Sequence, residues 1–98
     1  MTLGVISRDD ALTMNADYVA FSEGDFGKWE AINSEFQRLK RNDFVLCCRG
    51  KQYLICKVSS IRHNDIRAID GPLVRVTDGL QSWRVDGASY AAPIKGKK

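Results

Sequence analysis

The sequence lacks most of the features by which enzymes, membrane proteins and secreted proteins are recognised. Its 98 residues include one histidine, two prolines and three cysteines. No segment approaches the roughly 18 apolar residues that a membrane-spanning helix needs. The N-terminal segment has neither the basic start nor the long apolar run of a signal peptide. We therefore expect a protein of the cytoplasm that makes no membrane contact.

The cysteines do not form the pattern of a disulfide framework or a metal site. Their number is odd, and Cys47 and Cys48 are adjacent in an apolar run. On a strand, adjacent side chains point to opposite faces, which prevents both a shared metal and a disulfide. Burial raises the pKa of a thiol and makes it unreactive. We interpret all three cysteines as small apolar core residues and predict no metal and no cofactor.

Motifs of catalysis are also missing. His63 stands alone, and its neighbours Asn64 and Asp65 indicate a turn. A single histidine in a turn is usually a solvated side chain rather than a general base. The sequence has no glycine-rich phosphate loop and no nucleophile motif. These absences favour a binding protein over an enzyme.

The first third of the chain contains two helical patterns with an extended segment between them. Ser7 stands three residues before Asp10, as in a capping box, and predicts a short helix over residues 8–14. Aromatic and β-branched residues predict a strand at 17–21. The main helix is expected over residues 26–41. Its apolar stripe has helical spacing and consists of Trp29, Ile32, Phe36 and Leu39.

From residue 43 onward the pattern is that of strands. A continuous apolar run at 44–48 and an alternating run at 53–61 flank the turn Arg49-Gly50-Lys51, which predicts a β-hairpin. Turn residues then separate short strands expected near 66–69, 73–76, 81–85 and 88–91. We predict one α+β domain over residues 1–93, followed by a basic flexible tail at 94–98. Its fold should be a small, partly closed antiparallel β-barrel or bent sheet with the main helix packed on it.

Charge is distributed very unevenly along the chain. Residues 1–35 have a net charge of −5, and residues 36–98 have a net charge of +8. Such asymmetry says more about partners than about the fold. The basic part therefore indicates contact with an anionic partner.

The arginines of the later strands are the strongest indication of a site. If the strands pair, Arg67, Arg75 and Arg84 form a row on one face, where like charges repel unless an anion such as phosphate is bound. The glycine in the turn at Arg49 and Lys51 allows a backbone to approach a phosphate closely. Tyr53 and Trp83 are either stacking platforms for bases or core residues. The predicted contact residues are Arg49, Lys51, Lys57, Arg62, Arg67, Arg75, Arg84, Tyr53, Lys95, Lys97 and Lys98.

A family resemblance adds to this interpretation. Residues 18–61 resemble the PUA-like barrels, including the EVE and ASCH groups. The resembling residues are the segment at 18–21, the helix around Trp29, the polar turn with Asp43 and the strands that follow. The resemblance implies RNA binding or recognition of modified bases. The ASCH motif Gly-x-Lys-x-x-Glu-x-Arg is absent, so no base pocket is assigned.

Two functions remain open from the sequence. The first is a nucleic-acid-binding module that uses its basic strand face. The alternative is a protein-interaction module, such as a small inhibitor or adaptor. That module would place its basic face on an acidic protein surface or its acidic N-terminal part on a basic one, or would self-associate. If the arginines have no binding role, they are solvated and paired with turn aspartates, the candidates being Asp65, Asp70, Asp78 and Asp86.

Overall fold

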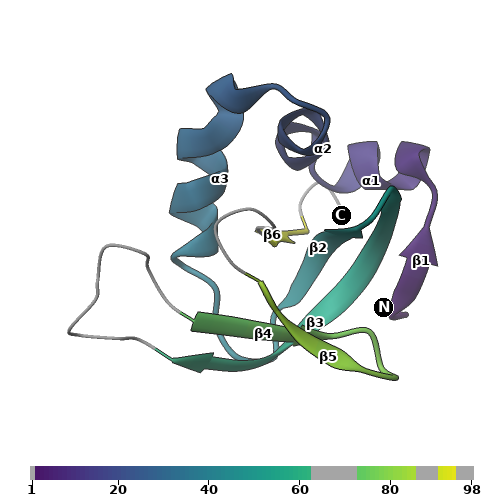
Figure 1. Cartoon of the computed structure of the whole chain (residues 1–98), viewed down its shortest axis with the longest axis vertical. Coiled ribbons are helices and arrows are strands. Elements are labelled where there is room, and N and C mark those ends of the chain that lie inside the picture. The colour runs from purple at the N-terminus through teal and green to yellow at the C-terminus, as the bar shows by residue number, and fades with distance from the viewer. Residues whose placement is uncertain (1, 63–72, 86–90, 95–98) are drawn as a thin grey trace.

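The computed structural model describes residues 2–62, 73–85 and 91–94. It is an α+β structure with three short α-helices above a six-stranded antiparallel sheet (Figure 1). The elements are β1 (Gly4–Ile6), α1 (Arg8–Met14), α2 (Ala16–Ser22), the 3₁₀-helix η1 (Phe26–Lys28), α3 (Trp29–Phe36), β2 (Phe44–Arg49), β3 (Gln52–Arg62), β4 (Leu73–Thr77), β5 (Ser82–Val85) and β6 (Ala92–Pro93).

The long strand β3 organises the sheet. The strand order is β5-β4-β3-β2-β6, and β1 pairs with the first half of β3. The same edge of β3 pairs with β1 at residues 53–55 and with β4 at residues 57–62. Figure 1 shows the resulting bend, in which β4 and β5 run across the direction of β2. The α+β class and the bent sheet are confirmed, whereas the described strands do not close into a barrel.

The predicted helix at 8–14 is confirmed as α1, and the predicted strand at 17–21 is wrong. Ser7 accepts a hydrogen bond from the backbone N–H of Asp10 at 3.1 Å and caps α1. Asn15 accepts one from Tyr18 N at 3.1 Å, and this cap begins α2 where we expected a strand. Tyr18 and Val19 are buried in the core, so burial of one helix face outweighs their strand propensity.

The main helix is shorter than its apolar stripe suggested. It covers η1 and α3 and ends at Phe36 rather than near residue 41. After it, Lys40 N donates to the Asp43 carboxylate at 2.8 Å, and Asn42 has a φ of 76°, which redirects the chain into β2. Ile32 and Phe36 are buried as expected, but Trp29 is 44% exposed, so its placement in the core was wrong.

The hairpin prediction is confirmed by β2 and β3. Gly50 occupies the turn with a φ of 64°, a conformation that glycine adopts without steric cost. The strands expected at 73–76 and 81–85 correspond to β4 and β5. The strand expected at 66–69, and most of that at 88–91, lie outside the described residues. The short strands β1 and β6 were not expected from the sequence.

Candidate functional site

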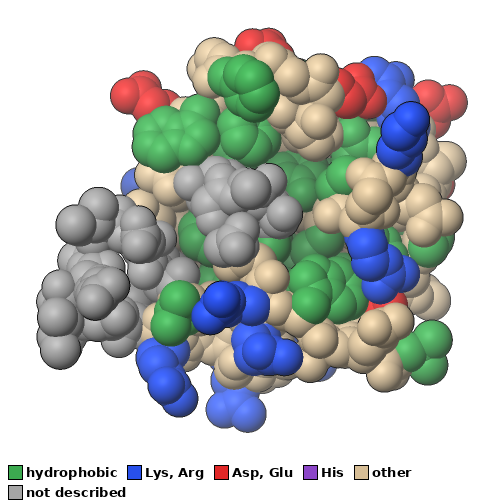
Figure 2. Space-filling view, viewed as in Figure 1, with side chains coloured by type: hydrophobic (Ala, Val, Ile, Leu, Met, Phe, Trp, Pro, Cys, Tyr) green, Lys and Arg blue, Asp and Glu red, His purple; other side chains and the backbone are tan. Residues whose placement is uncertain are grey.

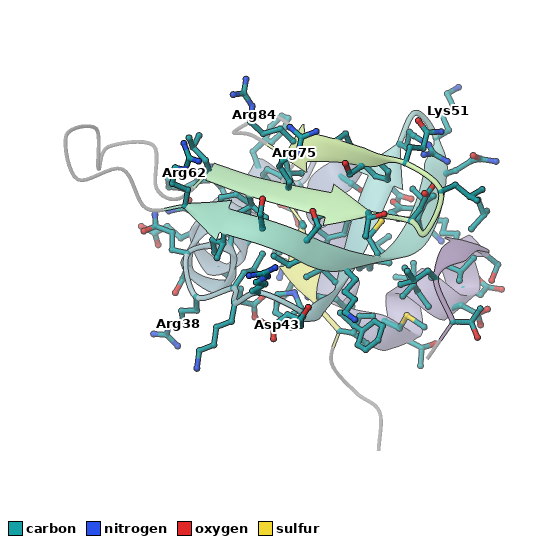
Figure 3. The ribbon with its side chains drawn as sticks, turned by 90° about the horizontal axis from the view of Figure 1, so that it is seen from below. Arg38, Asp43, Lys51, Arg62, Arg75 and Arg84 are labelled. Atoms are coloured by element: carbon teal, nitrogen blue, oxygen red, sulfur yellow. The ribbon has the colours of Figure 1, made fainter. Side chains whose placement is uncertain are left out.

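One face of the sheet around β4 is not covered by the helices, which lie on its other side (Figures 1 and 3). We call it the outer face. Paired residues on neighbouring strands share a face, so the register defines its members. They are Lys57, Ser60 and Arg62 of β3, Leu73, Arg75 and Thr77 of β4, and Ser82 and Arg84 of β5.

A β-bulge in β3 determines which side chains reach this face. The pairing with β4 shifts between Val58 and Ser60. The shift adds one residue, so Lys57 and Arg62, which would otherwise point to opposite faces, both lie on the outer face. Val58, Val74 and Val76 point to the opposite side and are fully buried.

Arg75 and Arg84 are direct cross-strand partners on the outer face. Side chains at such positions begin about 4.5–5.5 Å apart, and like charges there repel. Both arginines are exposed, and neither has an ion-pair partner among the residues that the structure describes. Figure 3 shows Arg62 near the same end of the sheet as this pair. The three guanidinium groups form a basic cluster, although Arg67, the third member of the predicted row, lies outside the described residues.

Lys57 lies further along the outer face. Its Nζ is 5.9 Å from the centre of the Phe44 ring, which is 37% exposed. A cation over an aromatic ring at an exposed site is worth only about 0.5–1 kcal/mol. Lys57 therefore remains available to an anion while partly covering the ring.

Arg49 does not join the basic cluster. It pairs with the Asp78 carboxylate at 3.1 Å and lies 5.1 Å from the centre of the Trp83 ring. The backbone N–H groups of Gln81 and Leu80, and then Arg49, hold the pKa of Asp78 below its usual range. Arg49 is therefore neutralised by a turn aspartate, as the alternative interpretation of the arginines predicts.

Lys51 and Tyr53 also lie apart from the outer cluster. Figure 3 shows Lys51 at the opposite end of the sheet from Arg62. Tyr53 is only 6% exposed, and its hydroxyl lies 2.5 Å from Ser22 Oγ. Its ring is therefore not available for stacking on a base. Trp83 is half-buried against the core beneath Arg49.

Several predicted contacts have no described position. Arg67, Lys95, Lys97 and Lys98 lie outside the described residues, as does His63. For these side chains the predictions stand unchanged.

Sequence reasoning missed an exposed aromatic patch on the helices. Phe26 is 74% exposed and makes an edge-to-face contact with Phe21, with the ring centres 6.0 Å apart. Trp29, also exposed, comes directly after η1 and is the first residue of α3. The helical stripe had assigned Trp29 to the core, and Phe26 lay outside the stripe. Asp25 precedes Phe26 and Glu30 follows Trp29, and these acidic neighbours could have indicated that both rings lie at the surface.

Charge is distributed unevenly over the face shown in Figure 2. Lys and Arg side chains lie along its lower edge, on the β4–β5 side, and acidic side chains lie mainly at the upper end over the helices, where further Lys and Arg side chains are seen at the upper right. On this face the lower edge is therefore mainly basic, and the upper end carries charges of both signs.

The thiols of Cys47 and Cys56 are buried, and the hydrogen bond from Cys47 lowers the pKa of Cys56. The same hydrogen bond, together with burial, raises the pKa of Cys47. Burial also raises the pKa of Cys48. Within the described ranges no three metal-ligating side chains come together.

No described helix is both long and apolar enough to cross a bilayer. Comparisons with known proteins give no further guide, because no family model, curated protein or solved structure matches the chain.

Proposed function

We propose that this chain is a non-catalytic module that binds nucleic acid through its outer face. Arg62, Arg75 and Arg84 contact backbone phosphates, and Lys57 extends the contact along the sheet. The three free cysteines suit a reducing compartment, and we place the module in the cytoplasm.

The observation that carries the proposal is the pairing of Arg75 with Arg84. Two exposed cations held face to face, without a carboxylate partner in the described part of the chain, leave a site of positive potential. A phosphate between them accepts charge-assisted hydrogen bonds from both and removes their repulsion.

The chemistry of the outer face favours phosphate contacts over base stacking. Its side chains from β3, β4 and β5 are basic, hydroxyl-bearing or aliphatic, and the ring of Phe44, which pairs with Lys57 from β2, is partly covered by that lysine. Binding should therefore depend steeply on salt and weakly on sequence. The resemblance to PUA-like barrels makes RNA the first polymer to test.

The test is a salt titration of RNA binding by the chain and two double variants. Replacing Arg75 and Arg84 by Gln removes two phosphate contacts and should lower the slope of log affinity against log salt by about 2. The matched control replaces Arg38 and Arg41 by Gln, which removes the same charge from exposed positions off the outer face. Affinity independent of salt, or equal losses in both variants, contradicts the proposal.

A second candidate is a protein-interaction module, and the aromatic patch favours it. Phe26 and Trp29 expose large apolar surface within the acidic N-terminal part, an arrangement suited to a basic protein partner. Pull-down with and without nuclease separates the two functions. A partner that survives nuclease and is lost in Phe26→Ser supports the second function, whereas complete loss with nuclease contradicts it.

A further inference from the structure

A pocket lies away from the outer face, where the end of α2 meets the turn between β2 and β3. Its volume is about 330 Å³. That value is at the lower end of the roughly 300–1,000 Å³ found for small-molecule sites. The polar groups that line it include Arg8, Ser22, Glu23, Lys51 and Tyr53.

One wall of the pocket contains a two-pronged ion pair. Arg8 Nε donates to Glu23 Oε2 at 2.5 Å, and Arg8 Nη2 donates to Glu23 Oε1 at 2.8 Å. The bond from Arg8, more than any other contact, holds the pKa of Glu23 below its usual range. A guanidinium has further N–H donors beyond this fork, and the described residues supply no acceptor for them. They remain available to a ligand.

The floor of the pocket presents an oriented hydroxyl. Ser22 Oγ donates its single proton to the Val19 carbonyl at 2.9 Å. The Tyr53 hydroxyl oxygen lies 2.5 Å from Ser22 Oγ, and it donates to Glu23 Oε2 at 3.4 Å. The phenolic oxygen keeps its acceptor capacity and can receive a hydrogen bond from a hydroxyl of a ligand.

The rim adds a positive charge. Lys51 lines the pocket from the hairpin turn, is exposed, and has no ion-pair partner among the described residues. Two cations and one carboxylate leave the pocket with a net positive charge, which selects an anion of limited size.

We propose that this pocket binds a small organic anion. Its phosphate or carboxylate group lies against Lys51 and the free donors of Arg8, and its hydroxyl group donates to the Tyr53 oxygen. This inference does not depend on nucleic-acid binding, because the pocket and the basic cluster lie at different ends of the sheet (Figure 3).

Calorimetric titration with three probes tests the inference. Glycerol 3-phosphate and glycerate distinguish a phosphate from a carboxylate site, and inorganic phosphate lacks the hydroxyl-bearing carbon chain. We expect saturable binding of one of the two organic anions, tighter than that of inorganic phosphate. Absence of saturation with both organic anions overturns the proposal.

Two variants locate the binding in this pocket. Lys51→Ala should lower the affinity for the bound probe by about tenfold, because a charge-assisted hydrogen bond is lost. The matched control Lys40→Ala removes an exposed lysine elsewhere and should have no effect. Tyr53→Phe, with its thermal midpoint checked, should abolish the preference for the organic anion over inorganic phosphate. Equal affinities for the chain and Lys51→Ala, or an unchanged preference in Tyr53→Phe, contradict the assignment.

Discussion

Arg49 and Arg75 are both strand arginines, yet the structure gives them opposite electrostatic surroundings. Arg49 stacks on Trp83 and is neutralised by Asp78, whereas Arg75 faces Arg84 without a described carboxylate partner. Their positions in the sheet cause the difference, because the side chains of each strand alternate between its two faces. At the residue scale, charge alone therefore does not identify a contact residue.

The pKa of Asp78 provides a prediction about acid stability. Since its folded pKa is depressed by hydrogen bonds from the backbone of Gln81 and Leu80 and then by Arg49, its charge stabilises the fold above the unfolded pKa. This contribution is lost as the pH falls through the folded pKa. Thermal unfolding followed by circular dichroism should show Asp78→Asn less stable than the chain at neutral pH. The two should converge below about pH 4, whereas parallel curves contradict the prediction.

At the scale of elements, Asn15 determines the arrangement of the N-terminal helices. It follows α1, caps α2 through its side-chain oxygen, and donates from Nδ2 to the Pro93 carbonyl at 3.0 Å. It is 3% exposed, so water does not replace these bonds when the side chain is removed. One buried amide thus connects two helices to the strand β6.

Asn15→Ala should lower the free energy of unfolding by about 2–3 kcal/mol, because a helix cap is lost and the half-buried carbonyl of Pro93 loses its donor. Ser7→Ala is the matched control, since it removes an exposed cap with no link to another element and should cost about 1 kcal/mol. Urea unfolding measures both. Equal losses would show that the bond to Pro93 adds nothing.

At the scale of the whole molecule, the core joins the sheet and the helices into one cluster. Leu46 is fully buried and lies between Ile55 of β3 and Ala92 of β6 in the register. The same residue type at position 80 is 93% exposed. The pair therefore offers an identical substitution in two opposite environments.

Leu46→Ala should lower the free energy of unfolding by about 3 kcal/mol, from lost burial and the cavity left behind. Leu80→Ala should change it by less than about 0.5 kcal/mol. Chemical denaturation measures the two differences. A small loss at Leu46 would contradict its place in the core.

The predictions from sequence succeeded where a pattern is local and failed where distant contacts intervene. The helix that Ser7 caps and the hairpin around Gly50 follow from residues a few positions apart. The segment that includes Tyr18 had strand propensity but became helical, because Asn15 caps it and the core buries one helix face. Trp29 had helical spacing with Ile32, yet the helix begins there and leaves its ring exposed.

The candidate site, too, could be predicted from the sequence only in part. The sequence by itself determined that the later strands carry an excess of positive charge, since charge is counted from composition alone. Only the tertiary structure decided that Arg75 meets Arg84, that Arg49 is neutralised, and that Tyr53 is buried. The physical reason is that strand register and the β-bulge of β3 select the face of each side chain. Register depends on pairing between segments far apart in the chain.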